Sequence, residues 1–161
     1  RFSNDEKIAA LMDWTGDSYK SINGYLFGGR NPSKDVIHQV ECIDEAISDH
    51  ITRERFTVDR QMRLSTFHVN DMESLFDLNT GRTFEHIGYM ATSIKEGGID
   101  VDGEDRIATR ILVPPGSAGV YVEPITQHPG EYEILLPRGR TLRFEGLGAS
   151  DGRPIVYLRL L

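Results

Sequence analysis

The chain has 161 residues, 39% of them apolar, which is enough for one globular domain with a full hydrophobic core. Its formal net charge of -7 argues against general affinity for nucleic acid, which needs a basic surface, and leaves room only for a nucleic-acid acceptor held in a local cleft. A single cysteine, Cys42, rules out an internal disulfide. The five histidines show no ligand spacing, so we expect no metal site.

No apolar run is long enough to span a bilayer and no secretory signal is present, so we expect no membrane partner. The chain begins at Arg1 without a methionine. We therefore expect residues 1–161 to form a single domain that was excised from a longer protein.

Helical periodicity dominates the first 50 residues. One helix is predicted to begin at Asn4 and to end at Trp14-Thr15-Gly16, and a second is predicted from about Asp17 to Leu26. Asn31-Pro32-Ser33 then supply a cap and a first turn. Apolar residues every three or four positions after this turn predict an amphipathic helix that ends at about His50.

Strand patterns and turn signals fill the remainder of the chain. Phe56–Val58 is predicted as the first strand, a short helix is predicted over Asp71–Leu78, and a polar loop containing glycines is predicted over Lys95–Asp105. The other predicted strands are Phe84–Ile94, Arg106–Val113, Gly119–Val122, Tyr132–Leu136, Thr141–Phe144 and Ile155–Leu160. Helices first and strands afterwards indicate an α+β domain with a mostly antiparallel sheet. Glycine-rich phosphate-binding motifs are absent, which argues against a Rossmann or Walker nucleotide site.

Two carboxylates, Glu131 and Glu133, flank Tyr132 at the start of a strand that Pro137 bounds. In an extended segment they would share one face, where like charges repel and resist burial. A solvated edge strand would tolerate such a pair. Alternatively, the pair acts on a developing cation and a nucleophile within one pocket, and the spacing by itself leaves both interpretations open.

Three other stretches carry residue types that suit a site. Arg60 follows a buried strand and is either a surface cation or a fixed guanidinium for a phosphate, with Arg63 as a rival for that role. Thr92 and Ser93 are either ordinary strand residues or groups that orient a carboxylate and shape a pocket floor. The loop 95–105 is either a simple connection or a segment that closes over a ligand.

Taken in this order, the stretches resemble the catalytic domain of bacterial mono-ADP-ribosyltransferase toxins, the group around iota toxin and the insecticidal actin-modifying toxins. That family carries an arginine on its first strand, a Ser-Thr-Ser motif on a later strand, and Glu-x-Glu or Gln-x-Glu late in the domain. The counterparts here are Arg60, Ala91-Thr92-Ser93 and Glu131-Tyr132-Glu133. Other stretches that resemble the family are Trp14–Asn23, Leu112–Val122 and Gly130–Gly139.

The resemblance implies N-terminal helices packed on a mostly antiparallel, two-sheet β core, with NAD as co-substrate and no metal. It implies that Glu133 stabilises the oxocarbenium-like ribosyl cation formed when NAD loses nicotinamide, a cation also met in glycoside hydrolysis. Arg60 would hold the pyrophosphate of NAD, with Arg63 as the alternative arginine.

By the same resemblance, Thr92 and Ser93 would line the floor on the nicotinamide side. The loop 95–105 would correspond to the family's phosphate–nicotinamide loop, and Arg106 at its end would help to bind phosphate. One position departs from the family, because Ala91 replaces the first serine of Ser-Thr-Ser. The hydroxyl that helps to orient the catalytic glutamate in the family must then be missing or replaced by another group.

Glu131 would face the acceptor. In the family, Glu-x-Glu enzymes commonly modify arginine, whereas Gln-x-Glu enzymes modify glutamine or asparagine, so we expect an arginine on a protein of the target cell. Residues 123–130 would select that protein. The resemblance also implies a secreted or injected effector that acts in the target-cell cytoplasm, with a cognate immunity protein as a further partner. Two alternatives are an NAD glycohydrolase toxin, in which water is the acceptor, and a non-catalytic domain of the same fold that binds a partner.

Overall fold

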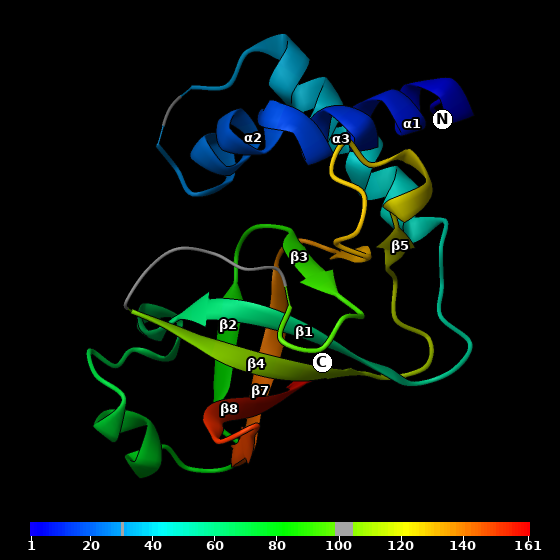
Figure 1. Ribbon diagram of the computed structural model, residues 1–161. Helices are drawn as coiled ribbons and strands as arrows, with labels where there is room; N and C mark the ends of the chain where they lie inside the picture. Colours follow the sequence, from blue (N-terminus) through cyan, green and yellow to red (C-terminus); the bar gives the residue numbers. More distant parts are fainter. Residues whose placement is uncertain (30, 99–104) are drawn as a thin grey trace.

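The helices of the first 50 residues lie together over one part of the β structure (Figure 1). The computed structural model describes residues 1–29, 31–98 and 105–161. The helices are α1 (Asn4–Asp13), α2 (Tyr19–Leu26) and α3 (Lys34–Ser48), as the periodicity predicts. None of the helices in the described ranges is long and apolar enough to cross a membrane.

Local capping explains where these helices begin. Ser3 caps α1, with its side chain accepting from the Glu6 amide while Glu6 accepts from the Ser3 amide, and Ser33 caps α3 by accepting from the Val36 amide. Between α1 and α2 the chain forms a π-helical turn, Trp14–Ser18, in which Gly16 has non-helical backbone angles. The predicted break at Trp14-Thr15-Gly16 is therefore a kink that joins two helices.

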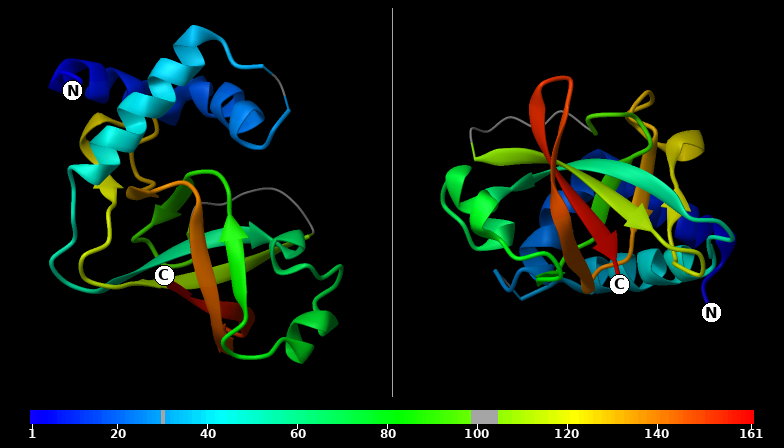
Figure 2. Two further views of the ribbon diagram at one scale, coloured as in Figure 1. Left: turned by 180° about the vertical axis from the view of Figure 1, so that it is seen from behind. Right: turned by 90° about the horizontal axis from the view of Figure 1, so that it is seen from below.

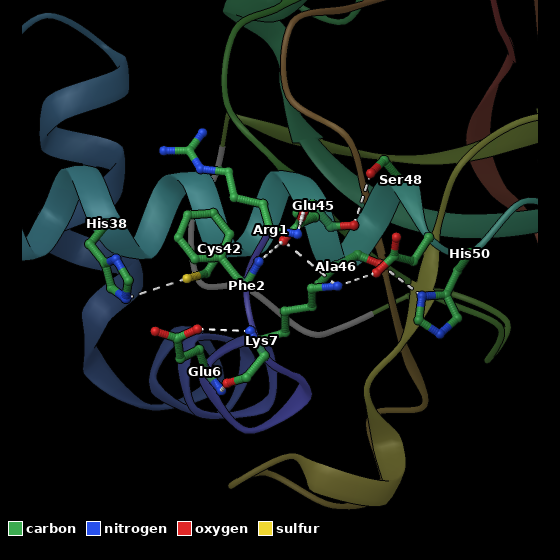
Figure 3. A network of polar contacts seen from close by, with 12 residues as sticks. Arg1, Phe2, Glu6, Lys7, His38, Cys42, Glu45, Ala46, Ser48 and His50 are labelled. Atoms are coloured by element: carbon green, nitrogen blue, oxygen red, sulfur yellow. Dashed lines mark hydrogen bonds and ion pairs between the residues drawn. The ribbon is translucent and has the colours of Figure 1, made fainter.

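Charged and polar contacts hold α1 and the residues before it along α3 (Figure 3). Lys7 on α1 forms an ion pair of 2.6 Å with Asp49, which follows α3, and the Phe2 amide donates to the Glu45 carboxylate at 2.9 Å. Apolar contacts from both helices continue into a core cluster beneath them. The helices thus form one layer and do not pack independently on the strands.

The β-strands form one mixed sheet in which every pair but one is antiparallel. Their order is β2-β7-β8-β4-β1-β3-β6-β5, and β4 with β8 is the parallel pair. Their bounds are β1 Phe56–Arg63, β2 Thr83–His86, β3 Met90–Ser93, β4 Arg106–Val113, β5 Val120–Tyr121, β6 Glu133–Leu136, β7 Arg140–Ser150 and β8 Arg153–Leu160. This architecture confirms the α+β class with a mostly antiparallel sheet.

The sheet divides into two parts that meet at a single register pair, Asp59 of β1 with Ser93 of β3. β2, β7, β8, β4 and β1 form the larger part, and β3, β6 and β5 form the smaller part. Two hydrophobic clusters pack against the sheet. One lies mainly on the larger part and also includes Met90 of β3 and Leu136 of β6, and the other lies between the helices and the smaller part.

Several predicted elements differ from the structure, and β1 and β7 are longer than the predicted strands Phe56–Val58 and Thr141–Phe144. The strand predicted over Phe84–Ile94 is two strands, because β2 pairs with β7 in the larger part whereas β3 pairs with β6 in the smaller part. The helix predicted over Asp71–Leu78 is a short 3-10 helix, Glu73–Asp77. The strand predicted from Tyr132 begins at Glu133, since Tyr132 has a positive φ of 49° that cannot continue a strand.

A buried ion pair joins the sheet to the segment that follows β3. Asp59 is 5% exposed, accepts from Nε and Nη2 of Arg110, both at 2.9 Å, and accepts from the Gly97 amide at 2.8 Å. Arg110 also contacts Glu96 at 3.2 Å, a residue whose side chain is largely exposed. Because Asp59 precedes Arg60, this network fixes the backbone beside a candidate site residue.

Replacement of Asp59 should therefore test how strongly this network stabilises the fold. Asp59→Ala would leave the Arg110 guanidinium and the Gly97 amide without their acceptor, and we expect a loss of about 3 kcal/mol in the free energy of unfolding. The matched control is Glu96→Gln, which removes an exposed partner and should change that free energy by less than about 0.5 kcal/mol. Urea denaturation measures both, and equal losses would contradict the assigned role of Asp59.

Candidate active site

Strand pairing brings the three sequence motifs to one place. Asp59 pairs with Ser93 across β1 and β3, and Ser93 pairs with Glu133 across β3 and β6. The residue after Asp59 is Arg60, whose Nη1 donates to the backbone oxygen of Ala91 at 2.8 Å. Residues that lie more than 70 positions apart in the chain thus meet at the junction between the two parts of the sheet.

A cavity of about 400 Å³ opens at this junction, between the helical layer and the strands. It contains four of the residues that the sequence singled out: Arg60, Arg106, Glu131 and Glu133. The rest of its lining is Trp14, Thr15, Tyr19, Asn23, Gln61, Tyr89, Ala91 and His128. The two glutamates therefore lie in one pocket, and β6 is flanked by β3 and β5, so the solvated edge strand does not describe them.

The Glu133 carboxylate is buried in this cavity without a full set of partners. The residue is 5% exposed, and its Oε2 has no hydrogen-bond partner among the residues that the structure describes. The pKa of Glu133 is raised to about 7, chiefly by burial and then by the nearby charge of Glu131, although a hydrogen bond from the Trp14 side chain and the charge of Arg60 act in the opposite direction. Near neutral pH the group therefore lies close to the midpoint of its ionisation.

The Arg60 guanidinium lies in the same cavity. Burial lowers the pKa of Arg60 to about 10, as does the charge of Arg106, whereas the Glu133 carboxylate raises it. Nη1 donates to the Ala91 carbonyl, whereas Nε has no hydrogen-bond partner among the described residues. The guanidinium keeps a positive charge at physiological pH and has a donor to offer.

Three buried side-chain atoms lack a hydrogen-bond partner among residues 1–29, 31–98 and 105–161: Asn23 Oδ1, Arg60 Nε and Glu133 Oε2. All three residues line the 400 Å³ cavity. Unsatisfied buried polar atoms are costly and rare in native proteins, so their gathering in one cavity indicates a polar ligand that supplies the missing partners. Two acceptor oxygens and a cation with a spare donor suit a ligand with hydroxyl and phosphate groups.

Thr92 and Ser93 do not line the cavity, although the family pattern places them on its floor. Both are fully buried, and the Thr92 hydroxyl donates to the Ile134 carbonyl at 2.7 Å. The Ser93 hydroxyl donates to the Glu131 carbonyl at 2.5 Å and accepts from the Lys95 amide at 2.9 Å. The Thr92 hydroxyl thus braces β6, which carries Glu133, and the Ser93 hydroxyl braces the turn that carries Glu131.

A second cavity, of about 540 Å³, shares Asn23, Arg60, Gln61 and Arg106 with the first. Arg63 is exposed and lines only this second cavity, where it pairs in register with Arg106. Arg60 is thus the arginine that lies beside Glu133, and Arg63 lies farther along the cleft. Arg106 lines both cavities, as expected of a residue near the middle of an extended ligand.

The polar loop predicted over 95–105 is described only in part, because residues 99–104 lie outside the described ranges. Its first residues pack tightly on β1. Gly98 has a φ of 74°, and a Cβ at this position would lie 3.1 Å from the Arg60 Cα. A glycine is therefore required where the segment passes over the site arginine.

Sequence reasoning did not assign roles to Trp14, Asn23 or His86. Trp14 and Asn23 begin and end the stretch that carried part of the family resemblance, so a signal for them existed. His86 lines the second cavity, and its Nδ1–H donates to the Gly88 carbonyl at 2.8 Å. Burial and then the Arg60 charge lower the pKa of His86 to about 4, so the ring is neutral at pH 7. No local pattern marked that histidine.

Comparison with known proteins agrees with this geometry. Residues 1–155 match the family model described as ADP-ribosyltransferase exoenzyme. The chain belongs to this exoenzyme family. It is 30% identical over 167 residues to an epidermal cell differentiation inhibitor of Staphylococcus aureus, with 86% of this chain and 66% of that protein covered. It is 28% identical to mono-ADP-ribosyltransferase C3 of Clostridium botulinum D phage, and the match covers 96% of this chain and 68% of that protein.

Solved structures of the exoenzyme fold superpose closely. Plx2a, an ADP-ribosyltransferase toxin from Paenibacillus larvae, has a TM-score of 0.80 at 21% identity and covers 99% of this chain and 87% of its own. C3stau2 from S. aureus, solved with NAD, has a TM-score of 0.80 at 21% identity, and the match covers 100% of this chain and 88% of C3stau2. The family resemblance inferred from the motifs is confirmed. The chain spans about two thirds of the length of the curated relatives that it matches over most of its own length.

Among the described residues, no group of three or more histidine, cysteine, aspartate and glutamate side chains is placed to hold a metal ion. The polar groups that line the cavity are carboxylates, guanidinium groups and neutral hydrogen-bonding side chains.

The buried Glu133 should make the protein less stable as pH rises. Its pKa of about 7 in the folded state lies above the ordinary value of 4.5, so the folded state binds the proton more tightly. The resulting stabilisation is complete below pH 4.5 and is lost as pH rises through 7. Glu133→Gln keeps the shape without the charge, and at pH 8 it should raise the free energy of unfolding by up to about 3 kcal/mol relative to wild type.

Denaturation at pH 5 and pH 8 measures this difference. The gain from Glu133→Gln should be small at pH 5 and large at pH 8. Glu54→Gln, at an exposed position, is the control and should show no such trend. A gain that is the same at both pH values would show that the carboxylate is not buried in its charged form.

Proposed function

We propose that the chain transfers ADP-ribose from NAD to an arginine side chain of a protein, with release of nicotinamide. The observation that carries this proposal is the buried, partly unpartnered Glu133 carboxylate in a cavity with Arg60. Membership of the exoenzyme family, and the NAD bound to the related C3stau2, support NAD as the substrate of that cavity.

The reaction breaks the bond between nicotinamide and ribose and leaves positive charge on the ribose. The Glu133 carboxylate would stabilise this charge and accept a hydrogen bond from a ribose hydroxyl. Its unpartnered Oε2 supports this role. Fixed electrostatic stabilisation at the point where charge develops is worth several kcal/mol in a water-poor site.

Arginine side chains would hold the rest of the substrate. Arg60 offers an unpartnered donor to the pyrophosphate, and Arg106 lines both cavities. Arg63 would contribute from the outer cavity. A planar guanidinium binds phosphate oxygens with two parallel hydrogen bonds, so these residues would fix the orientation of NAD as well as bind it.

Glu131 would act on the acceptor. An arginine nucleophile is protonated at neutral pH, so one nitrogen must lose a proton as it bonds to the ribose carbon. Glu131 lines the cavity and is less buried than Glu133, which supports its assignment to an incoming guanidinium. It would orient that group and accept the proton.

Separate substitutions of the two glutamates test this assignment. Glu133→Gln should lower both nicotinamide release and protein labelling by a factor of ~10² to 10³ or more. Glu131→Gln should keep nicotinamide release in water and lower labelling of target-cell lysate proteins by biotinylated NAD. Near wild-type NAD cleavage by Glu133→Gln would refute the role of Glu133. Nicotinamide release without any labelled protein would favour the NAD glycohydrolase alternative.

The pH profile of NAD cleavage provides a test of the electrostatics. At low NAD concentration, the pH dependence of the rate reports the pKa values of groups in the free enzyme. The carboxylate form of Glu133 is the active form. The rate should therefore rise with pH and level off above about 7. Glu131→Gln removes a like charge that raises the pKa of Glu133, so the midpoint should move to lower pH. An unchanged midpoint in this variant would contradict the charge interaction between the two residues.

The biological setting follows as part of the proposal. The relatives include proteins described as an ADP-ribosyltransferase toxin and as a mono-ADP-ribosyltransferase. We infer a secreted or injected effector that acts on a protein in the target-cell cytoplasm, with a cognate immunity protein as a further partner. Mass spectrometry of the labelled protein would identify both the target and the modified side chain.

A further inference from the structure

The Glu123 carboxylate binds the backbone on both sides of Glu131. Its Oε1 accepts from the Gly130 amide at 2.7 Å, and its Oε2 accepts from the Tyr132 amide at 2.9 Å. Glu123 lies in a short 3-10 helix, Glu123–Ile125, that follows the edge strand β5. Hydrogen bonds from amides to a charged carboxylate are stronger than those between neutral groups, so both oxygens constrain the segment.

The segment around Glu131 has a backbone that needs such support. Gly130 has a φ of 93° and Tyr132 a φ of 49°, and the left-handed region is unfavourable for a tyrosine. The Ser93 hydroxyl holds the Glu131 carbonyl at 2.5 Å from the opposite side. Glu131 is thus fixed through its neighbours' amides and its own carbonyl, while its side chain lines the cavity.

The segment between Glu123 and Gly130 is also attached to the helical layer, and the two views of Figure 2 show it against the N-terminal helices. The Gln127 amide donates to the Thr15 hydroxyl at 3.1 Å, and the Gln127 side chain donates to the Met12 carbonyl at 2.9 Å. A Cβ on Gly16 would lie 2.8 Å from the end of the Gln127 side chain, so the two segments approach each other closely at this point. These contacts anchor the segment that lies between Glu123 and Glu131 in the chain.

Glu133 is held in a different way. It belongs to β6 and pairs with Ser93 of β3, while its carbonyl accepts from the Val122 amide at 3.0 Å. None of these contacts uses the Glu123 side chain. Loss of that side chain should therefore release Glu131 and leave Glu133 in place.

We propose that Glu123 is a positioning residue that sets the orientation of Glu131 toward the protein acceptor and thereby decides how much ADP-ribose passes to protein instead of to water. This inference rests on the proposed function of Glu131. Glu123 itself does not line the cavity, so it acts through the backbone of residues 130–132.

The test compares Glu123→Ala, which removes both acceptors, with Glu123→Gln, which keeps one acceptor oxygen. Glu54→Ala, at an exposed position outside the cavities, is the matched control. Biotinylated NAD and target-cell lysate measure protein labelling, and nicotinamide release in buffer measures hydrolysis. Glu123→Ala should lower labelling about 10- to 100-fold, the range seen when a group that orients a site residue is removed. Hydrolysis should stay within about twofold of wild type, and Glu123→Gln should give an intermediate loss.

Two further readouts separate positioning from a general structural effect. In the Glu131→Gln background, Glu123→Ala should cause no additional loss of labelling, because the residue through which it acts is already removed. Hydrogen exchange at the Gly130 and Tyr132 amides should become at least tenfold faster in Glu123→Ala, with the strands β3 and β6 unaffected.

Parallel loss of labelling and hydrolysis, a full additional loss in the Glu131→Gln background, or unchanged exchange at the two amides would each overturn the inference. Failure of the proposed function has a different signature. A wild-type protein that releases no nicotinamide would refute NAD cleavage, and the exchange measurement would still decide whether Glu123 holds the segment.

Discussion

Burial of the Glu133 carboxylate beside Arg60 is the constraint on which the rest of the site depends. A carboxylate that is 5% exposed would take up a proton in an apolar cavity, and the guanidinium partly offsets that tendency. Neither group is fully satisfied, because Glu133 Oε2 and Arg60 Nε have no hydrogen-bond partner in the described part of the chain. The fold thus holds two buried polar groups with unpartnered atoms, and a bound ligand can supply the missing partners. This is typical of a ligand-binding site and untypical of an ion pair in a hydrophobic core.

The division of the sheet explains how this arrangement is maintained. β1 brings Arg60 from the larger part and β6 brings Glu133 from the smaller part, and the two parts meet at one register pair. Because the two parts of the sheet share a single register pair, the junction leaves a cavity that the helical layer covers but does not fill. Asp59 on the neighbouring position anchors the segment after β3 through Arg110 and Gly97, which fixes the backbone beside Arg60.

Ala91 shows how the site departs from its family pattern. The first serine of the family's Ser-Thr-Ser is absent, and the backbone oxygen of Ala91 accepts from Arg60. Trp14 from the helical layer lines the cavity and lowers the pKa of Glu133, so the support of the carboxylate comes in part from the N-terminal helices. Ser93 retains its hydroxyl but uses it on the Glu131 carbonyl, on the acceptor side of the site.

The sequence by itself determined the fold class, the three helices, most strands and the motif residues, because periodicity, caps and turn residues act over short distances. The spacing of Glu131 and Glu133 marked them, yet it suggested an extended segment with both carboxylates on one face. The tertiary structure decided the difference between them: Glu133 lies in a paired strand and is buried, whereas Glu131 lies in a turn that Glu123 and Ser93 hold. It also decided between Arg60 and Arg63 as the neighbour of Glu133, and it added Asn23 and His86 to the cleft. Burial and pairing across distant strands set these properties, and no local pattern in the chain encodes them.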